Sequence, residues 1–411
     1  MDNQLFEKVS KTIDSFRNDS VELQKKLIST PAIGPESGGE GEMKKYQLLE
    51  PLLKQVSDEL TTMHAKDDRV PSGLRPNAMA KIKGKNNKVN LWIMAHMDVV
   101  PAGDEKQWKT KPFEATIQDG KIIGRGAEDN HHGICAGYFA MKALKQLKIT
   151  PPVNVCLLLI SDEEVSNEYG ITHIIKNHKS LFNKNDLFIV PDSGDEKGET
   201  IECAEKHVVW LKFTTTGKQS HAAFPNLGKN ACRAAAHLIV AMEKLRDKYS
   251  MTDKVFVDPS YCTIEPTKRL ANVPNVNTIP PEDVTFFDCR LLPEVNVDKF
   301  IADVKEIARG VESKFGVKIA VDIDSLMPAS YTPPDSAVVK RLQIAAKAVY
   351  NTDAKPIGIG GATVSSLLRQ EGFQAACFGK IFETCHQPNE FTTIDGILGD
   401  AKVFAHTALQ D

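Results

Sequence analysis

The 411-residue sequence lacks several features that would place it in a specialised class of protein. Its longest apolar runs, such as residues 153–160, are far shorter than the roughly 20 residues that a membrane-spanning helix needs. The N-terminal residues carry no basic stretch followed by an apolar one, so no secretory signal is predicted. Eight cysteines are scattered without a CxxC pair, which argues against a disulfide scaffold and favours reduced thiols. We therefore expect a cytoplasmic protein that does not enter a membrane.

The sequence also lacks an excess of charge of either sign. Lysine and arginine together number 51, and aspartate and glutamate 54. This balance gives no reason to expect nucleic acid or an anionic membrane as a partner. The chain is 41% hydrophobic and 26% charged, which is ordinary for a globular protein. Its length predicts two domains, because a single hydrophobic core rarely grows so large.

Short apolar runs and helical patterns alternate along most of the chain. The first sixty residues are predicted to be helical, except for a loop at 33–42. Apolar runs at 89–95, 153–160 and 187–190 are predicted to be buried strands, and a helical pattern at 134–144 separates the first two. Buried strands that alternate with helices indicate a mostly parallel sheet with helices on both faces.

The pattern changes near residue 204. Apolar and polar residues alternate from Val209 to Thr214, which is typical of a half-exposed strand, and two helical stripes and further strands follow. A helical pattern and a buried strand at 374–378 then return to the earlier alternation of helices and buried strands. We therefore predict an α/β fold in which a smaller α+β domain, 204–330, is inserted into a larger domain made of 1–203 and 331–411.

Histidine and acidic residues cluster where the predicted strands end. They follow four strands and occupy one helix-entry loop: His96 and Asp98, Asp129, Asp162 to Glu164, Asp192, and His386. Ligands of an open parallel sheet bind beyond the carboxyl ends of its strands, so these side chains are expected to face one crevice. Each motif alone has a commonplace explanation, because a His-x-Asp pair or an Asp-Glu-Glu run is usually a solvated loop. Their joint placement favours a functional site.

The donor set predicts a metal centre. Two imidazoles with three carboxylates suit zinc, and cobalt or manganese often substitutes at such sites. Five side-chain ligands exceed what one catalytic zinc takes while keeping an open position, so two metals that share a carboxylate fit better. Of the adjacent Glu163 and Glu164, one can coordinate while the other takes a proton from the attacking water.

At these residues the sequence resembles the dinuclear zinc amidohydrolase and exopeptidase family. That family includes acetylornithine deacetylase, succinyl-diaminopimelate desuccinylase, aminoacylase, the carboxypeptidase G type and carnosinase-like dipeptidases. The resemblance runs from about Leu23 to His406. It rests on motifs in a fixed order: Ala95-His-Met-Asp-Val-Val-Pro, Gly124-Arg-Gly-Ala-Glu-Asp, Ser161-Asp-Glu-Glu, Pro191-Asp-Ser-Gly and His386-Gln-Pro-Asn-Glu.

The resemblance implies two metal sites in a catalytic domain, 1–203 and 331–411, with an inserted lid or dimerisation domain, 204–330. Glu163 would be the general base and acid, and Asp98 would orient a metal-bound imidazole. The implied ligands are His96, Asp129 and Asp192 for one metal, and Asp129, Glu164 and His386 for the other.

The resemblance also implies residues that contact the substrate. His221, in Ser220-His-Ala-Ala-Phe-Pro, would stabilise the oxyanion, and in dimeric members this histidine comes from the partner subunit. Arg290 would grip a carboxylate with two hydrogen bonds. A structural loop histidine and an ordinary strand-end arginine are the alternatives for these two. Further contacts are implied for Asn277 and for the glycine-rich loop at Gly360, Gly361 and Thr363. We expect a homodimer through the inserted domain, although some relatives are monomers.

Two departures from the family pattern concern the substrate region. Asp129 precedes Asn-His-His-Gly where many members have x-Lys-Gly, and Val364 stands where many deacetylase-like members have an aspartate. The favoured function is an N-acyl-amino-acid deacylase that cleaves an amide bond in a small carboxylate-bearing substrate. A metallo-dipeptidase or exopeptidase is the alternative. A non-catalytic binding protein on the same fold is opposed by the complete set of ligands.

Overall fold

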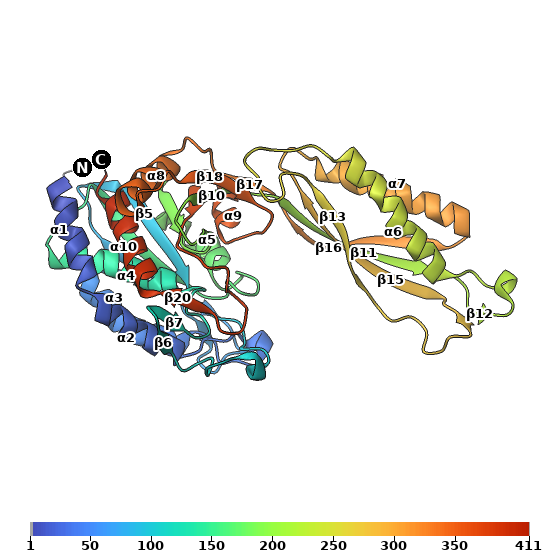
Figure 1. Cartoon of the computed structure of the whole chain (residues 1–411), viewed down its shortest axis with the longest axis horizontal. Coiled ribbons are helices and arrows are strands. Elements are labelled where there is room, and N and C mark those ends of the chain that lie inside the picture. The colour runs from blue at the N-terminus through green and yellow to red at the C-terminus, as the bar shows by residue number, and fades with distance from the viewer. Residues whose placement is uncertain (1–2, 411) are drawn as a thin grey trace. The chain divides into compact units, whose positions relative to one another are not determined.

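The computed structural model describes residues 3–410 (Figure 1). Internal contacts divide the chain into two units. Unit 1 takes in the described residues up to Cys203, Thr332–Pro356, and the residues from Thr363 onward. Unit 2 consists of Ala204–Tyr331 and Ile357–Ala362. None of the helices in residues 3–410 is both long and apolar enough to cross a membrane.

Unit 1 is built on a sheet whose central strands are parallel. The order is β1 (Glu59–Thr62), β4 (Ala78–Ile82), β8 (Val153–Ile160), β5 (Asn86–His96), β9 (Leu187–Val190), β19 (Gln374–Cys377) and β10 (Thr200–Glu205). The pairs from β8 through β5 and β9 to β19 are parallel, whereas β1, β4 and β10 are antiparallel to their neighbours. All eight residues of β8 are buried, as a strand covered on both faces requires.

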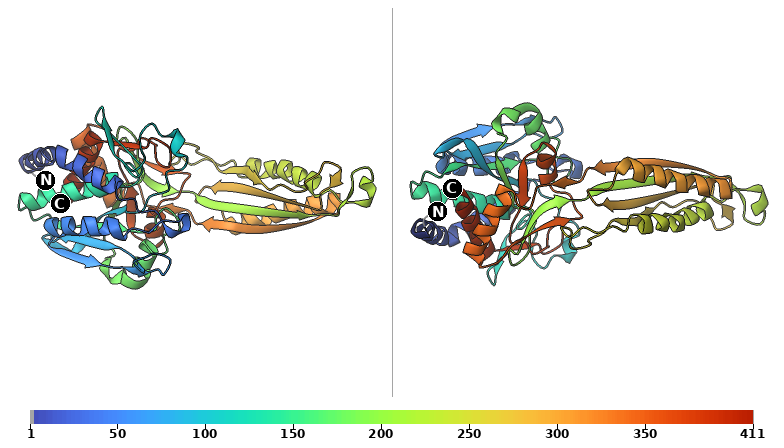
Figure 2. Two further views of the ribbon diagram at one scale, coloured as in Figure 1. Left: turned by 90° about the horizontal axis from the view of Figure 1, so that it is seen from below. Right: turned by 90° about the horizontal axis from the view of Figure 1, so that it is seen from above.

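Helices cover both faces of this sheet. On one face, Gly137 lets α4 approach Ile93 and Leu157 closely, because a Cβ there would fall 2.7 Å from a Leu157 methyl group. Trp92 and Leu158 face the other side, where they join the buried residues of α5 and α9. The helices of unit 1 are α1 (Asn3–Asp14), α2 (Arg17–Ile28), α3 (Met43–Val56), α4 (His131–Gln146), α5 (Ile171–His178), α8 (Ala337–Tyr350), α9 (Ser365–Gln370) and α10 (Ile394–Ala408). The first and last helices pack together, so the two ends of the chain lie close to each other (Figure 2).

Short elements of unit 1 complete the surroundings of the site. A three-stranded sheet joins β6 (Thr116–Gln118), β7 (Lys121–Ile123) and β20 (Phe391–Thr393), and a two-stranded one joins β2 (Ala65–Lys66) and β3 (Leu74–Arg75). Single turns of 3₁₀ helix lie at Pro35–Ser37, Glu105–Gln107 and Lys179–Leu181.

Unit 2 is an antiparallel sheet with two helices on one face. Its strands are ordered β13 (Thr263–Arg269), β15 (Glu282–Leu291), β11 (His207–Thr216) and β16 (Lys318–Met327), and α6 (Ala231–Lys248) lies beside α7 (Val297–Phe315) (Figure 1). Leu211 and Phe213 are buried under these helices, whereas Trp210, which precedes Leu211, is exposed. A small ribbon pairs β12 (Ser220–His221) with β14 (Thr278–Ile279), and Pro225–Leu227 forms a 3₁₀ turn.

The predicted α/β class, with parallel strands at the centre and helices on both faces, is confirmed. The first sixty residues differ from the sequence prediction: the first helical stretch breaks into α1 and α2, and the second ends at Val56 before strand β1. The structure also groups Ile357–Ala362 with unit 2, because the end of β18 (Lys355–Ile359) bridges Phe256 and Gly360 accepts a hydrogen bond from Arg290. β17 (Ser330–Tyr331) pairs with Ala204 and Glu205.

Candidate metal centre

The metal-ligand candidates of unit 1 lie at one edge of the sheet. β8, β5, β9 and β19 are parallel neighbours, so their carboxyl ends share this edge. The residues placed there are His96 at the end of β5, Glu163 and Glu164 after β8, Asp192 after β9, and His386 after β19. Asp129 joins them from the loop that enters α4. This edge of the sheet thus brings together side chains that are as much as 290 positions apart in the sequence.

Asp129 lies between the two histidines. Its Oδ1 is 2.7 Å from Nε2 of His96, and its Oδ2 is 3.3 Å from Nε2 of His386. His386 Nε2 is also 2.9 Å from Oε2 of Glu164, and His96 Nε2 is 3.6 Å from Oδ1 of Asp192. One carboxylate therefore spans two groups of donors, which is the arrangement that a shared metal ligand needs.

The donor set fits divalent cations. Ligand atoms of His96, Asp129 and Glu164 lie within 4.8 Å of one another, and so do those of His96, Glu163 and Asp192. Oε1 of Glu164 is buried without a hydrogen-bond partner, which is costly unless a cation or other donor meets it. Nitrogen and oxygen donors of this mixture suit zinc and similar metals.

Electrostatic effects within the site show a surplus of negative charge. Burial, and then the charge of Asp192, raise the pKa of Glu163 well above its usual value. Burial and Asp129 likewise raise the pKa of Glu164. Hydrogen bonds to Asp129 and Glu164 raise the pKa of His386 to about 10. Bound cations would offset this repulsion, because a metal ion is often the largest local charge in such a site.

Asp98 contacts two groups of the centre. Nδ1 of His96 is 3.0 Å from the main-chain oxygen of Asp98 and 3.6 Å from its carboxylate. The other carboxylate oxygen of Asp98 accepts a hydrogen bond from the backbone N–H of Glu164 at 2.9 Å. Donation from Nδ1 to either oxygen leaves Nε2 of His96 free to bind a metal.

The candidate substrate residues of unit 2 form two small groups. His221 and Asn277 are held together, because the backbone N–H of Ala222 donates to the main-chain oxygen of Asn277 at 2.8 Å. Arg290 donates to both carboxylate oxygens of Asp288, at 2.6 and 2.8 Å, and to the main-chain oxygen of Gly360 at 2.8 Å. Gly361 follows in the same loop, and Thr363, in unit 1, accepts the backbone N–H of Ser365.

Comparison with known proteins identifies the family. The model of the peptidase family M20/M25/M40 matches residues 92–410. The chain belongs to this family. It is 36% identical to an uncharacterized metallohydrolase of Methanococcus maripaludis, over 95% of this chain and 98% of the relative. It is 30% identical to a succinyl-diaminopimelate desuccinylase of Wolbachia pipientis, over 92% of this chain and 90% of the relative. The resemblance inferred from the motifs is thereby confirmed.

Solved structures share the fold of this M20/M25/M40 member. Human carnosine dipeptidase 1 superposes with a TM-score of 0.75 at 18% identity, covering 98% of each chain. A Bacillus subtilis protein described as a dinuclear metal binding peptidase from the M20 family gives 0.69 at 15% identity, covering 96% of this chain and 98% of the other. The chain is a metal-dependent hydrolase of this family, and its histidine and acidic side chains at the sheet edge have the geometry of a metal-binding cluster.

Two further acidic residues of this M20/M25/M40 member support the loops that carry the candidate ligands. Glu390 is buried and accepts hydrogen bonds from the backbone N–H groups of Gly126, Glu128 and Asp129, at 3.0–3.1 Å, and from Arg125 at 2.6 Å. Glu128 in turn supports the loop that carries His386. It accepts hydrogen bonds from the backbone N–H groups of Phe382 and Thr384 and from the Thr384 hydroxyl. Both glutamates lie inside motifs that carry the family resemblance, but the motifs alone did not indicate these supporting contacts.

Replacing Glu128 with glutamine is expected to weaken metal binding. The amide nitrogen would confront backbone N–H donors, so the loop that carries His386 would lose its anchor. Supports of metal ligands typically change affinity by about 10–100-fold, and we expect a loss of that size. Competition between the protein and a chelating dye for cobalt measures it. Glu114→Gln, which changes an exposed carboxylate paired with Lys111, is the control; equal affinity in both variants would contradict the prediction.

Proposed function

We propose that this M20/M25/M40 metallohydrolase removes the acyl group from N-acyl amino acids. The observation that carries the proposal is the Asp129 carboxylate between His96 and His386, with the half-buried Glu163 beside the same centre. The similarity to a desuccinylase over nine-tenths of the chain favours a deacylase. The structural likeness to a carnosine dipeptidase rests on lower identity, and a dipeptidase is the alternative.

Two divalent metal ions, zinc in the first instance, are proposed for the centre. When bound, such ions lower the pKa of water and polarise a carbonyl oxygen. Asp98 would hold His96 in the required orientation from behind. The proposed holders are His96, Asp129 and Asp192 for one ion, and Asp129, Glu164 and His386 for the other.

Glu163 is proposed as the group that moves protons. It would take a proton from the attacking water and return it to the nitrogen of the leaving amine. Its burial favours the protonated form, because desolvation raises the pKa of a carboxyl group. A carboxyl group with a raised pKa is suited to holding a proton between the two steps.

His221 and Arg290 are proposed to contact the substrate. Nδ1 of His221 accepts a hydrogen bond from the backbone N–H of Ala223 at 3.0 Å, which leaves its Nε2–H as a donor for an oxyanion. A substrate carboxylate would compete with Asp288 for the guanidinium of Arg290. Asn277, Gly360, Gly361 and Thr363 are proposed as further contacts, and a homodimer through unit 2 is proposed as the assembly.

Hydrolysis of a mixed substrate panel tests the proposed function. The panel contains N-acetyl and N-succinyl amino acids and unmodified dipeptides, each with added zinc, cobalt or manganese. We expect amino-acid release from the acylated substrates, and a strong chelator is expected to abolish it because metal ions polarise the scissile carbonyl. Cleavage of free-amine peptides alone would reassign the protein as a dipeptidase. A chain that takes up none of the three metals would instead favour a binding protein.

A further inference from the structure

The loop that carries Glu163 and Glu164 is attached at both ends to a single short segment, Arg75 to Asn77. At its start, the backbone N–H of Ser161 donates to Oδ1 of Asn77 at 3.0 Å, and the Ser161 hydroxyl donates to the main-chain oxygen of Pro76. At its end, the Asn77 amide donates to the main-chain oxygen of Tyr169 at 2.8 Å. Residues that lie far earlier in the sequence thus hold both ends of this loop.

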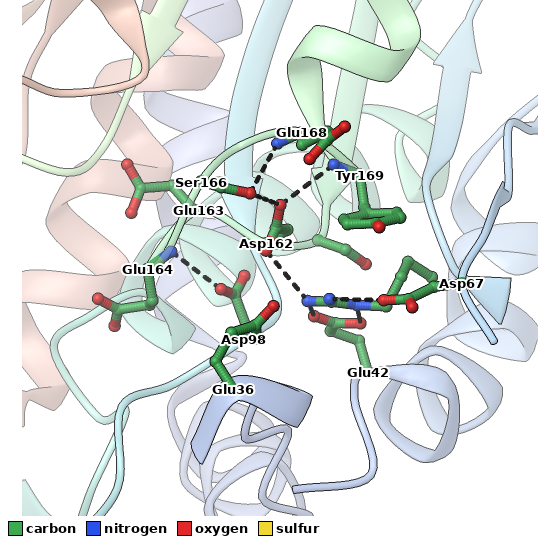
Figure 3. A network of polar contacts seen from close by, with 12 residues as sticks. Glu36, Glu42, Asp67, Asp98, Asp162, Glu163, Glu164, Ser166, Glu168 and Tyr169 are labelled. Carbon is green, nitrogen blue, oxygen red and sulfur yellow. Dashed lines mark hydrogen bonds and ion pairs between the residues drawn. The ribbon is translucent and has the colours of Figure 1, made fainter. Parts of the chain in front are cut away.

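Arg75 extends this attachment into the interior of the loop. Its side chain has no exposed surface, and its guanidinium donates to both carboxylate oxygens of Glu42. Nη2 of Arg75 also lies 3.5 Å from Oδ1 of Asp162, and Nη1 lies 3.4 Å from Oδ2 of Asp67. Figure 3 shows Glu42, Asp67 and Asp162 converging on this one cation. Among the described residues, Arg75 is therefore the only cation that forms an ion pair with Asp162.

Asp162 precedes Glu163 and adopts a backbone conformation that needs support. Its φ is +64°, in the left-handed region that residues other than glycine seldom occupy. Its Oδ2 accepts hydrogen bonds from the Ser166 hydroxyl at 2.6 Å and from the backbone N–H of Tyr169 at 3.1 Å. Its Oδ1 is buried without a hydrogen-bond donor and faces Arg75 (Figure 3). The left-handed turn at Asp162 sets the direction in which the next two side chains leave the backbone.

We infer that Arg75 is a positioning residue for hydrolysis, because through Asp162 it fixes the turn that directs Glu163 and Glu164 into the metal centre. The inference rests on the proposed function, in which Glu163 moves protons and Glu164 holds a metal. Asp98 completes the arrangement from the other side by accepting the backbone N–H of Glu164. Positioning matters here because a catalytic group that is misplaced by about 1 Å can cost about 100-fold in rate.

Arg75→Met and Arg75→Lys test the inference by two independent readouts. The first is a cobalt titration followed by the visible absorption of the bound ion, which reports the ligand arrangement without turnover. The second is the separation of kcat from KM on a substrate that the parent enzyme cleaves. We expect about 10–100-fold weaker cobalt binding and a similar fall in kcat, with KM changed little. Arg75→Lys is expected to restore only part of either, because one ammonium cannot reproduce the planar guanidinium fork.

Arg369→Met is the matched control for loss of a buried ion pair. Arg369 and Glu202 form another fully buried, two-contact pair in unit 1, apart from the 161–169 loop. Both methionine variants should lower the melting temperature, but only Arg75→Met should change cobalt binding and kcat. Equal kcat and cobalt affinity in Arg75→Met and Arg369→Met would overturn the inference.

Asp162→Asn keeps the test decisive if Arg75→Met does not fold. Asparagine can still accept from Ser166 and Tyr169 and tolerates the left-handed conformation, but it removes the charge that faces Arg75. We expect it to reduce cobalt affinity and kcat in the same direction, and unchanged values would overturn the inference. A parent enzyme that binds no cobalt and cleaves no panel substrate would contradict the proposed function itself, so the two failures are distinguishable.

Discussion

Glu163→Gln is expected to lower kcat by about 10²–10⁴-fold, the usual contribution of a general acid–base group. Glutamine keeps the shape of the side chain but can neither accept a proton from water nor return one to the leaving amine. Metal content should remain at the parental value, because the proposed ligands of both sites are untouched. Steady-state kinetics together with elemental analysis of the purified variant measure both quantities.

The same variant separates two roles for Glu163. Its carboxylate also lies within 4.8 Å of ligand atoms of His96 and Asp192, so a ligand role is geometrically open to it. Loss of a metal ion from Glu163→Gln would assign Glu163 as a ligand, and near-normal turnover with both metals bound would contradict its role in proton transfer. Glu168→Gln is the control, because Glu168 is an exposed carboxylate on the same loop.

Asp129→Ala is expected to be the most damaging change to metal binding. Its two carboxylate oxygens face different histidines, His96 and His386, so one substitution removes a ligand from both proposed sites. The loss of affinity should exceed the roughly 10–100-fold that follows from removing a support of a ligand. Activity at limiting metal should fall below detection. Elemental analysis and a cobalt titration measure the number of ions retained.

The stoichiometry is the decisive quantity for Asp129→Ala. A shared ligand predicts that both ions bind more weakly, whereas a ligand to one ion predicts that the other binds as before. Full retention of one ion with parental affinity would contradict the bridging role. Asp353→Ala, which removes a largely exposed carboxylate paired with Lys347, is expected to leave both ions and the activity unchanged.

The parts of the fold that could be predicted are those in which burial marks the sequence. β8 has an uninterrupted apolar run, so its bounds were predicted without error. β4, Ala-Met-Ala-Lys-Ile, pairs with β8 in the same sheet but carries a lysine and two alanines, and its pattern gave no signal. The prediction of a smaller domain began from residues 209–214, where β11 alternates between buried and less buried residues.

The candidate ligands could be proposed from the sequence because each one lies at the end of a strand, in the loop after a strand, or just before a helix. The supports Arg75, Glu128 and Glu390 could not, because their partners are distant in sequence and belong to no strand-end pattern. Glu42 and Arg75 are 33 positions apart, and Glu128 meets a loop some 254 positions later. A buried charge is visible in a sequence only as an ordinary polar residue until the fold supplies its partner.

The reciprocal support between Glu128 and Glu390 has a consequence for how the protein is made. Asp129 sits in a loop whose backbone is held by Glu390, and His386 sits in a loop held by Glu128. The loop of Asp129 has no anchor until Glu390 has left the ribosome, and the loop of His386 is made only shortly before that residue. The candidate metal centre can therefore form only late in synthesis, because a nascent chain that ends before residue 386 lacks both His386 and Glu390, the glutamate that holds the loop of Asp129.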